Sequence, residues 1–154
     1  MRDGVDSPDT FAGIIFVQAT GVVQLNGIGS AIFSSVGSSA EDAVGASANS
    51  GIVLIQAGSV EIDGRLGGAG ITTSNFDQGG AGSILIESDT DVIVRGRGGI
   101  VESTTSSSIP IFSTSTDQEP GLILIEAQRV GILNGAAIRV DNDGTGEPGL
   151  ISIE

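Results

Sequence analysis

The stretch Gly51-Ile52-Val53-Leu54-Ile55-Gln56-Ala57 decides how the rest of this chain of 154 residues is interpreted. A run of isoleucine, valine and leucine directly after a glycine is typical of a short, well-buried β-strand. Similar stretches begin at Gly13, Gly82, Gly121 and Gly149. A phrase that returns along the whole chain indicates a repeat protein, in which each unit is stabilised by its neighbours.

The spacing of this phrase shows that the repeat has two levels. Successive copies begin 38, 31, 39 and 28 residues apart, so long and short units alternate. Taken two units at a time, the spacings are 69, 70 and 67 residues. The sequence therefore predicts a paired repeat of one long and one short unit.

Each unit contains two further strand-like segments after the opening phrase. The second segments are residues 23–27, 60–64, 92–96 and, with one extra residue, 130–135. The third segments begin at Ile32, Ile71, Ile100 and Ile138. Asn-Gly or Asp-Gly ends three of the four second segments, which predicts corners that need a left-handed backbone conformation.

Three short strands per unit, joined by corners, predict an all-β fold: a right-handed parallel β-helix, a triangular solenoid of about four to five coils. Alternate residues of each strand should stack inside it, coil upon coil. On the first strand the expected ladders are Ile15, Val53, Ile84, Ile123 and Ile151, and Val17, Ile55, Ile86, Ile125 and Ile153. On the second strand they are Val23, Val60 and Val92, and Leu25, Ile62, Val94 and Leu133.

The same pattern divides the chain into two parts. Residues 1–12 are expected to be a lead-in from a preceding coil or loop, and residues 13–154 to be the β-helix repeats. Neither end resembles a polar cap, so we expect the chain to be a fragment of a longer array.

Composition excludes several functions. The net charge is −13, from 19 acidic residues against six arginines, and it would repel nucleic acid and an anionic membrane surface. The absence of cysteine excludes a disulfide framework and a thiolate zinc site. The sequence has no apolar run of about 18 residues, so we expect no membrane insertion.

The opening phrase, the Asn/Asp-Gly corners and the stretches 30–36 and 71–82 resemble the repeat region of filamentous haemagglutinin-like exoproteins, most closely the large cyanobacterial members. The resemblance covers nearly the whole chain. It implies two-partner secretion through an outer-membrane pore partner, and a location outside the cell or at the cell surface, associated with the outer membrane. The secretion domain of that family is missing, because the chain has no Asn-Pro dipeptide.

One cluster could carry catalysis of the kind found in pectin-lyase-like β-helix enzymes. Glu61 and Asp63 lie beside Arg65, and Arg95 and Arg97 are expected one coil further on. Carboxylates with arginines can supply an acid, a base and charge stabilisation. The preferred interpretation is a solvated strand face with ion pairs between coils, because the chain lacks histidine, lysine and tyrosine.

Two other polar features have simple explanations. Residues 141–147 begin like a calcium loop, but they lack the bidentate glutamate at the expected spacing, so a polar corner loop is preferred. The threonine and serine runs 72–74, 103–108 and 113–116 could order water on an ice-binding face, but they lie in segments of unequal length. We therefore assign no catalytic, cofactor-binding or metal-ligating residue, and expect no cofactor.

The outward side of the first strand is unusually apolar. If the ladders point inward, then Ile14, Phe16, Ile52, Leu54, Leu85, Leu122 and Leu124 point outward. A bare stripe of this size is unusual on a soluble monomer. Either the long segments 33–50 and 101–120 fold over it or a partner covers it, and the apolar residues of those segments favour the first explanation.

Together these features predict the structural shaft of a secreted or cell-surface adhesin-like exoprotein. Its expected role is adhesion or surface interaction without catalysis. The surface ligand is left open, with a carbohydrate or another cell-surface protein as candidates. The alternative is a carbohydrate-active β-helix enzyme.

Overall fold

The computed structural model describes residues 10–36, 48–76, 79–105, 120–142 and 148–154. Every helix or strand in these ranges is a β-strand, which confirms the all-β prediction. The strands are β1 (Thr10–Phe11), β2 (Ile14–Asn26), β3 (Ser30–Val36), β4 (Ala48–Asn49), β5 (Ile52–Asp63), β6 (Ala69–Asn75), β7 (Ser83–Ser88), β8 (Asp91–Arg95), β9 (Gly99–Thr105), β10 (Leu122–Glu126), β11 (Arg129–Leu133), β12 (Ala137–Asn142) and β13 (Leu150–Ile153).

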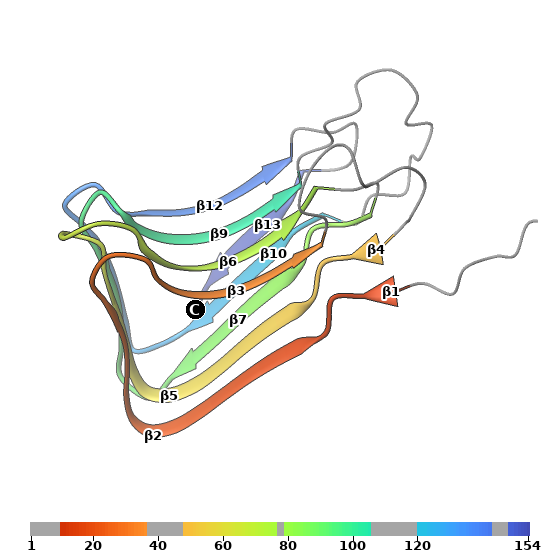
Figure 1. The fold of residues 1–154 in the computed structure, drawn as a ribbon. Coiled ribbons are helices and arrows are strands. Elements are labelled where there is room, and N and C mark those ends of the chain that lie inside the picture. Colours follow the sequence, from red (N-terminus) through yellow and green to blue (C-terminus); the bar gives the residue numbers. More distant parts are fainter. Residues whose placement is uncertain (1–9, 37–47, 77–78, 106–119, 143–147) are drawn as a thin grey trace, which may run out of the picture.

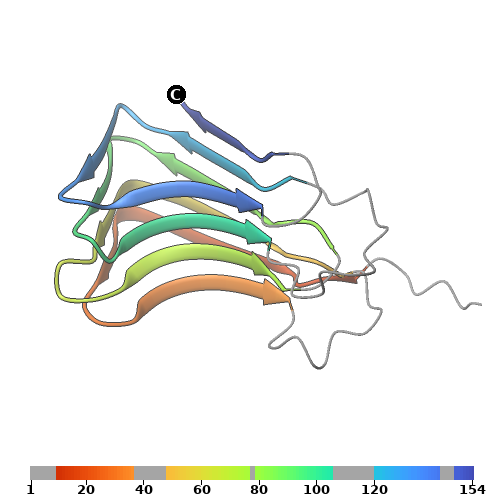
Figure 2. The same ribbon diagram turned by 90° about the horizontal axis from the view of Figure 1, so that it is seen from above.

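All of these strands pair in parallel, and each pairs with its counterpart in a neighbouring repeat. The largest sheet contains β2, β5, β7, β10 and β13, and continues around a bend into β8 and β11. A second sheet has the order β12-β9-β6-β3, and β1 pairs with β4. Figures 1 and 2 show these sheets curving around a common interior, with the second sheet facing the first. The parallel arrangement of the repeats is therefore confirmed.

The bend in the large sheet lies where one repeat has an additional residue. In β2 and β5 the first and second segments form one continuous strand, and the register shifts between Ala19 and Val22. Thr20 and Gly21 there lie beside Gly58 of the next repeat. A Cβ atom on Gly58 would be 2.7 Å from the carbonyl oxygen of Thr20, so glycine allows the strands to stay in contact across this β-bulge.

The core contains the predicted ladders of the first and second strands, together with Ile71 and Val101 of the third strands. Ile84 lies between Val53 and Ile123, and Ile86 lies between Ile55 and Ile125. All of these side chains are at most 1% exposed. Burial of each is worth roughly 1.5–3 kcal/mol, so stacked repeats supply most of the stabilisation. The same ladders include Ile15, Val17, Ile151 and Ile153, which are less buried because β2 and β13 pair on one side only.

One predicted ladder position, Leu133, and one predicted start of a third segment, Ile100, are each displaced by one residue in the structure. Val94 pairs with Ile132 rather than Leu133, because the extra residue of that repeat lies in the corner at Asn134, where φ is +56°, and not in the strand. On the third strand, the inward neighbour of Ile71 is Val101, while Ile100 faces outward beside Gly70. Side chains alternate between faces, so a shift of one residue reverses which side is buried.

The corners follow the prediction only in part. Gly27 and Gly135 have φ values of +103° and +82°, as expected for the Asn-Gly corners. Gly64 has no positive φ, and in its repeat Gly67 adopts one instead, at +147°. Gly64 is required for another reason, because a Cβ atom there would lie 1.9 Å from the backbone nitrogen of Gly99.

Other predictions lie outside the described residues. Most of the two long segments, at 37–47 and 106–119, and residues 143–147 of the calcium-like loop belong to this group. Nothing in the described ranges forms a helix long and apolar enough to cross a bilayer.

Candidate functional site

The outward side of the first-strand sheet is built from three columns of side chains, one residue from each strand. Two of these, which we call the apolar columns, are almost entirely hydrophobic. The first contains Ile14, Ile52, Ser83, Leu122 and Leu150, and the second contains Phe16, Leu54, Leu85, Leu124 and Ser152. Ile14 is 72% exposed and Phe16 is 52% exposed, so the predicted apolar stripe is present and open to solvent at β2.

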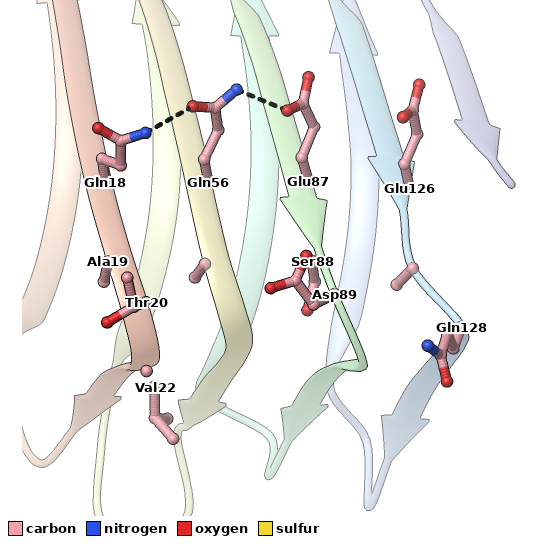
Figure 3. Close-up of a pocket in the computed structure, with 13 residues that line it drawn as sticks. Gln18, Ala19, Thr20, Val22, Gln56, Glu87, Ser88, Asp89, Glu126 and Gln128 are labelled. Atoms are coloured by element: carbon pink, nitrogen blue, oxygen red, sulfur yellow. Dashed lines mark hydrogen bonds between the residues drawn. The ribbon is translucent and has the colours of Figure 1, made fainter.

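A third column, the polar column, lies beside the apolar columns and contains Gln18, Gln56, Glu87, Glu126 and Glu154. Gln18 Nε2 donates a hydrogen bond to Gln56 Oε1 at 3.4 Å, and Gln56 Nε2 donates to Glu87 Oε2 at 2.6 Å (Figure 3). Glu126 is the register neighbour of Glu87, and the amide of Glu154 bonds to β10 at Ile125. Amides therefore occupy one end of the column and carboxylates the other.

The polar column borders an open hollow of about 1200 Å³ at the bend of the sheet (Figure 3). Its other lining residues are Ala19, Thr20, Gly21, Val22, Ala57, Ser88, Asp89, Ala127 and Gln128. No lining residue is basic, so Glu87, Asp89 and Glu126 give the hollow a negative charge. This site was not predicted from the sequence, although its signal is there: a Gln or Glu stands at the same position of every repeated phrase.

The cluster that the sequence suggested as a candidate for catalysis is brought together at the second strands, and its members form ion pairs. Arg65 Nη2 lies 2.5 Å from Asp63 Oδ2, and Arg95 Nε lies 3.1 Å from the same oxygen. Arg95 also pairs with Glu61. Asp63 is only 4% exposed. The ion pairs of the described chain do not include Arg97, which is exposed at the following corner.

The electrostatics of this cluster favour a structural role. Hydrogen bonds from Arg65 lower the pKa of Asp63, and they outweigh the opposite effect of burial. A general acid at neutral pH needs a raised pKa instead. Similar pairs join neighbouring repeats elsewhere, with Arg129 Nε 2.6 Å from Asp91 Oδ1 and Arg139 Nε 2.6 Å from Glu102 Oε1. The arrangement is that expected of a solvated strand face.

These ion pairs predict a specific loss of stability in acid. Hydrogen bonds from arginine lower the pKa values of Asp63 and Asp91 in the folded chain. Unfolding returns the pKa of both carboxyl groups to about 3.9, so the unfolded chain binds protons more readily than the folded chain. The stabilisation of the fold by these ion pairs should be fully present above about pH 3.9. It should be lost as the pH falls towards the lower pKa values of the folded chain. Thermal melting from pH 6 to pH 2.5 should therefore show a steeper acid decline for the native chain than for Asp63→Asn/Asp91→Asn; parallel profiles would contradict this.

The interior side of the second sheet carries polar ladders towards the ends of its strands. Ser34, Thr73 and Ser103 stack in register, and all are buried. Ser103 Oγ donates a hydrogen bond to the Gly82 carbonyl at 2.8 Å, and Asn75 Nδ2 donates to the Gly80 carbonyl at 2.9 Å. These two bonds satisfy backbone carbonyls, as is usual for buried polar groups, whereas the buried Thr73 hydroxyl has no hydrogen-bond partner.

The ice-binding and calcium interpretations gain no support from the described residues. On the outer face Thr72 lies between Phe33 and Glu102, so this part of the chain presents no threonine ladder. Asp141 lies 3.1 Å from Arg139 through an ion pair, and Asn142 accepts a hydrogen bond from Thr105. No group of three or more potential acidic, histidine or cysteine ligands is arranged to hold a metal within the described ranges.

Comparison with known proteins adds no relative. No family model, no curated protein and no solved structure matches this chain.

Proposed function

We propose that this chain is a segment of a right-handed parallel β-helix with three strands per coil, and that it serves as the structural shaft of a secreted or cell-surface adhesin-like exoprotein. The observation that carries the proposal is the continuous parallel register from repeat to repeat. The same position of the repeated phrase is matched from β2 through β5, β7 and β10 to β13. A shaft built this way can be extended by adding repeats.

General rules of strand connection support the handedness. Each pair of parallel strands in one sheet is connected by a segment that includes strands of another sheet, as from β5 through β6 to β7. Connections between parallel strands of one sheet are right-handed in nearly all proteins. The third segment of each repeat, in β3, β6, β9 or β12, supplies the third side of the proposed triangle.

The surface chemistry is suited to a non-catalytic shaft outside the cell. The ion pairs occupy the carboxylates of the only cluster that the sequence suggested for catalysis. The strong negative charge favours solubility of an apolar repeat chain. By resemblance to filamentous haemagglutinin-like proteins, an outer-membrane pore would export it, and its ligand would be a carbohydrate or another surface protein.

Antibodies raised against this chain provide the test in its natural host. We expect immunogold label on the outside of intact cells or in the medium, and loss of that label when a pore-forming secretion partner encoded beside the gene is deleted. Label that appears only after cells are permeabilised would overturn the proposed location. An experimental structure would decide the number of strands per coil and the handedness separately.

A further inference from the structure

We propose that the outer face of the first-strand sheet docks a basic amphipathic helix of another polypeptide. The apolar side of that helix would lie on the apolar columns, and its lysines or arginines would lie along the polar column. This inference rests on the register and exposure of one sheet, and it holds whether or not the chain belongs to an adhesin.

The positive and negative charges lie on different faces of the chain. Arg95, Arg129 and Arg139 lie on the second and third segments of their repeats, and each pairs with a carboxylate there. The strands β2, β5, β7, β10 and β13, which carry the apolar and polar columns, contain no arginine. Its glutamates, Glu87 and Glu126, have no basic neighbour in the hollow that they line. The negative charge of this face is therefore available to a cationic partner.

An apolar surface lies directly beside that charge. Ile14, Phe16 and Leu150 are 72%, 52% and 59% exposed on the edge strands β2 and β13, which pair on one side only. The inner leucines of the columns, Leu54, Leu85 and Leu124, are partly exposed as well. Exposed apolar surface next to a row of charge is typical of a docking surface and unusual on a free one. A partner that is both apolar and basic would satisfy the two features together.

The repeat distance along the columns is close to the rise of one helical turn. Neighbouring parallel strands are about 4.8 Å apart, so the five strands span roughly 19 Å. A helix laid along the columns rises about 5.4 Å per turn, and flexible lysine side chains can absorb the small difference. An extended strand in the same place would present residues of one face roughly every 6.7 Å, a poorer match. About 13 helical residues would cover the described face.

Two synthetic peptides test the proposal. The probe is a 15-residue peptide of leucine and lysine, with leucines three and four positions apart so that they form one helical face; the comparison peptide has the same composition in scrambled order. We expect the probe to bind the chain in isothermal titration calorimetry, and to gain helical circular dichroism on binding, with an affinity about tenfold above that of the scrambled peptide.

Variants on two faces distinguish docking at the columns from nonspecific electrostatic attraction of the cationic peptide to the acidic chain. Glu87→Gln/Glu126→Gln removes two charges from the polar column and should lower the affinity for the probe peptide about tenfold. Glu102→Gln/Asp141→Asn removes two charges from the face that carries Arg139, and should leave the affinity within about twofold. Leu85→Ser/Leu124→Ser should weaken binding while leaving the folded circular dichroism spectrum unchanged.

Three results would overturn the proposal. Equal binding of both peptides, or equal loss in the two double carboxylate variants, would mean attraction by net charge alone. No binding, combined with a large fall in melting temperature for Leu85→Ser/Leu124→Ser, would mean that another part of this chain covers the face. None of these results bears on the location of the protein, which antibody labelling tests independently.

Discussion

Replacing Ile86 with alanine is expected to lower the free energy of unfolding by about 3–4 kcal/mol. Ile86 lies in the central repeats, between Ile55 and Ile125, and only 1% of it is exposed. The neighbouring side chains are held by backbone pairing on both sides, so they cannot collapse into the space left by the missing methyl groups. Urea denaturation of the two chains measures the effect directly.

Leu85→Ala is the matched control, because it lies on the same strand and removes a side chain of the same volume class from the opposite face. Leu85 points outward and is partly exposed. We expect it to cost less than about 1 kcal/mol, since little burial is lost. Comparable losses for the two variants would show that the outward face is covered within the folded chain. They would also contradict the assignment of only one buried side to β7.

Gly64→Ala is expected to destabilise the chain by more than about 3 kcal/mol, or to prevent folding altogether. The new Cβ atom would lie 1.9 Å from the nitrogen of Gly99 and 2.1 Å from the carbonyl carbon of Gly98. Both atoms belong to the backbone of the next repeat, so relief requires the repeats to move apart. Melting followed by circular dichroism would detect the loss.

Gly68→Ala controls for the general effect of replacing glycine in the same corner. No atom lies within 4 Å of the Cβ position at Gly68, and its φ is not positive. Alanine there should be neutral or slightly stabilising, because it restricts the unfolded chain. If Gly64→Ala melted at the same temperature as Gly68→Ala, the close approach of the two repeats at Gly64 would be wrong.

Much of the core could be predicted because its signal is local. Side chains alternate between the two faces of a strand, so Val53 points inward and Leu54 points outward. This alternation does not depend on where the strand lies in the fold. The copies of the phrase align without gaps, so the pairing of Val53 with Ile84 follows from the sequence. The ion pairs around Asp63 were anticipated for the same reason, because Asp63 and Arg95 occupy matched positions of neighbouring repeats and Glu61 lies two residues before Asp63 on the same strand.

The third strands were harder, because their sequences contain glycine and small polar residues instead of a uniform apolar alternation. Ile100 was chosen as the counterpart of Ile71 by residue type, yet the structure places it opposite Gly70. The glycine leaves room for the isoleucine, since a Cβ atom on Gly70 would lie 2.6 Å from Ile100 Cγ2. Steric fit between repeats, rather than hydrophobicity along one of them, decided this register.

By itself, the sequence determined the β-strand content, the repeat spacing and the inward ladders of the first strand, since these depend on patterns within a few residues. Only the tertiary structure decided which corner glycine has a positive φ, how Ile100 packs, and that Gln18, Gln56, Glu87 and Glu126 line one hollow. It also separated the arginines from the apolar face. The physical reason is that these features arise between repeats, where backbone pairing brings together side chains about 30–40 positions apart in the chain.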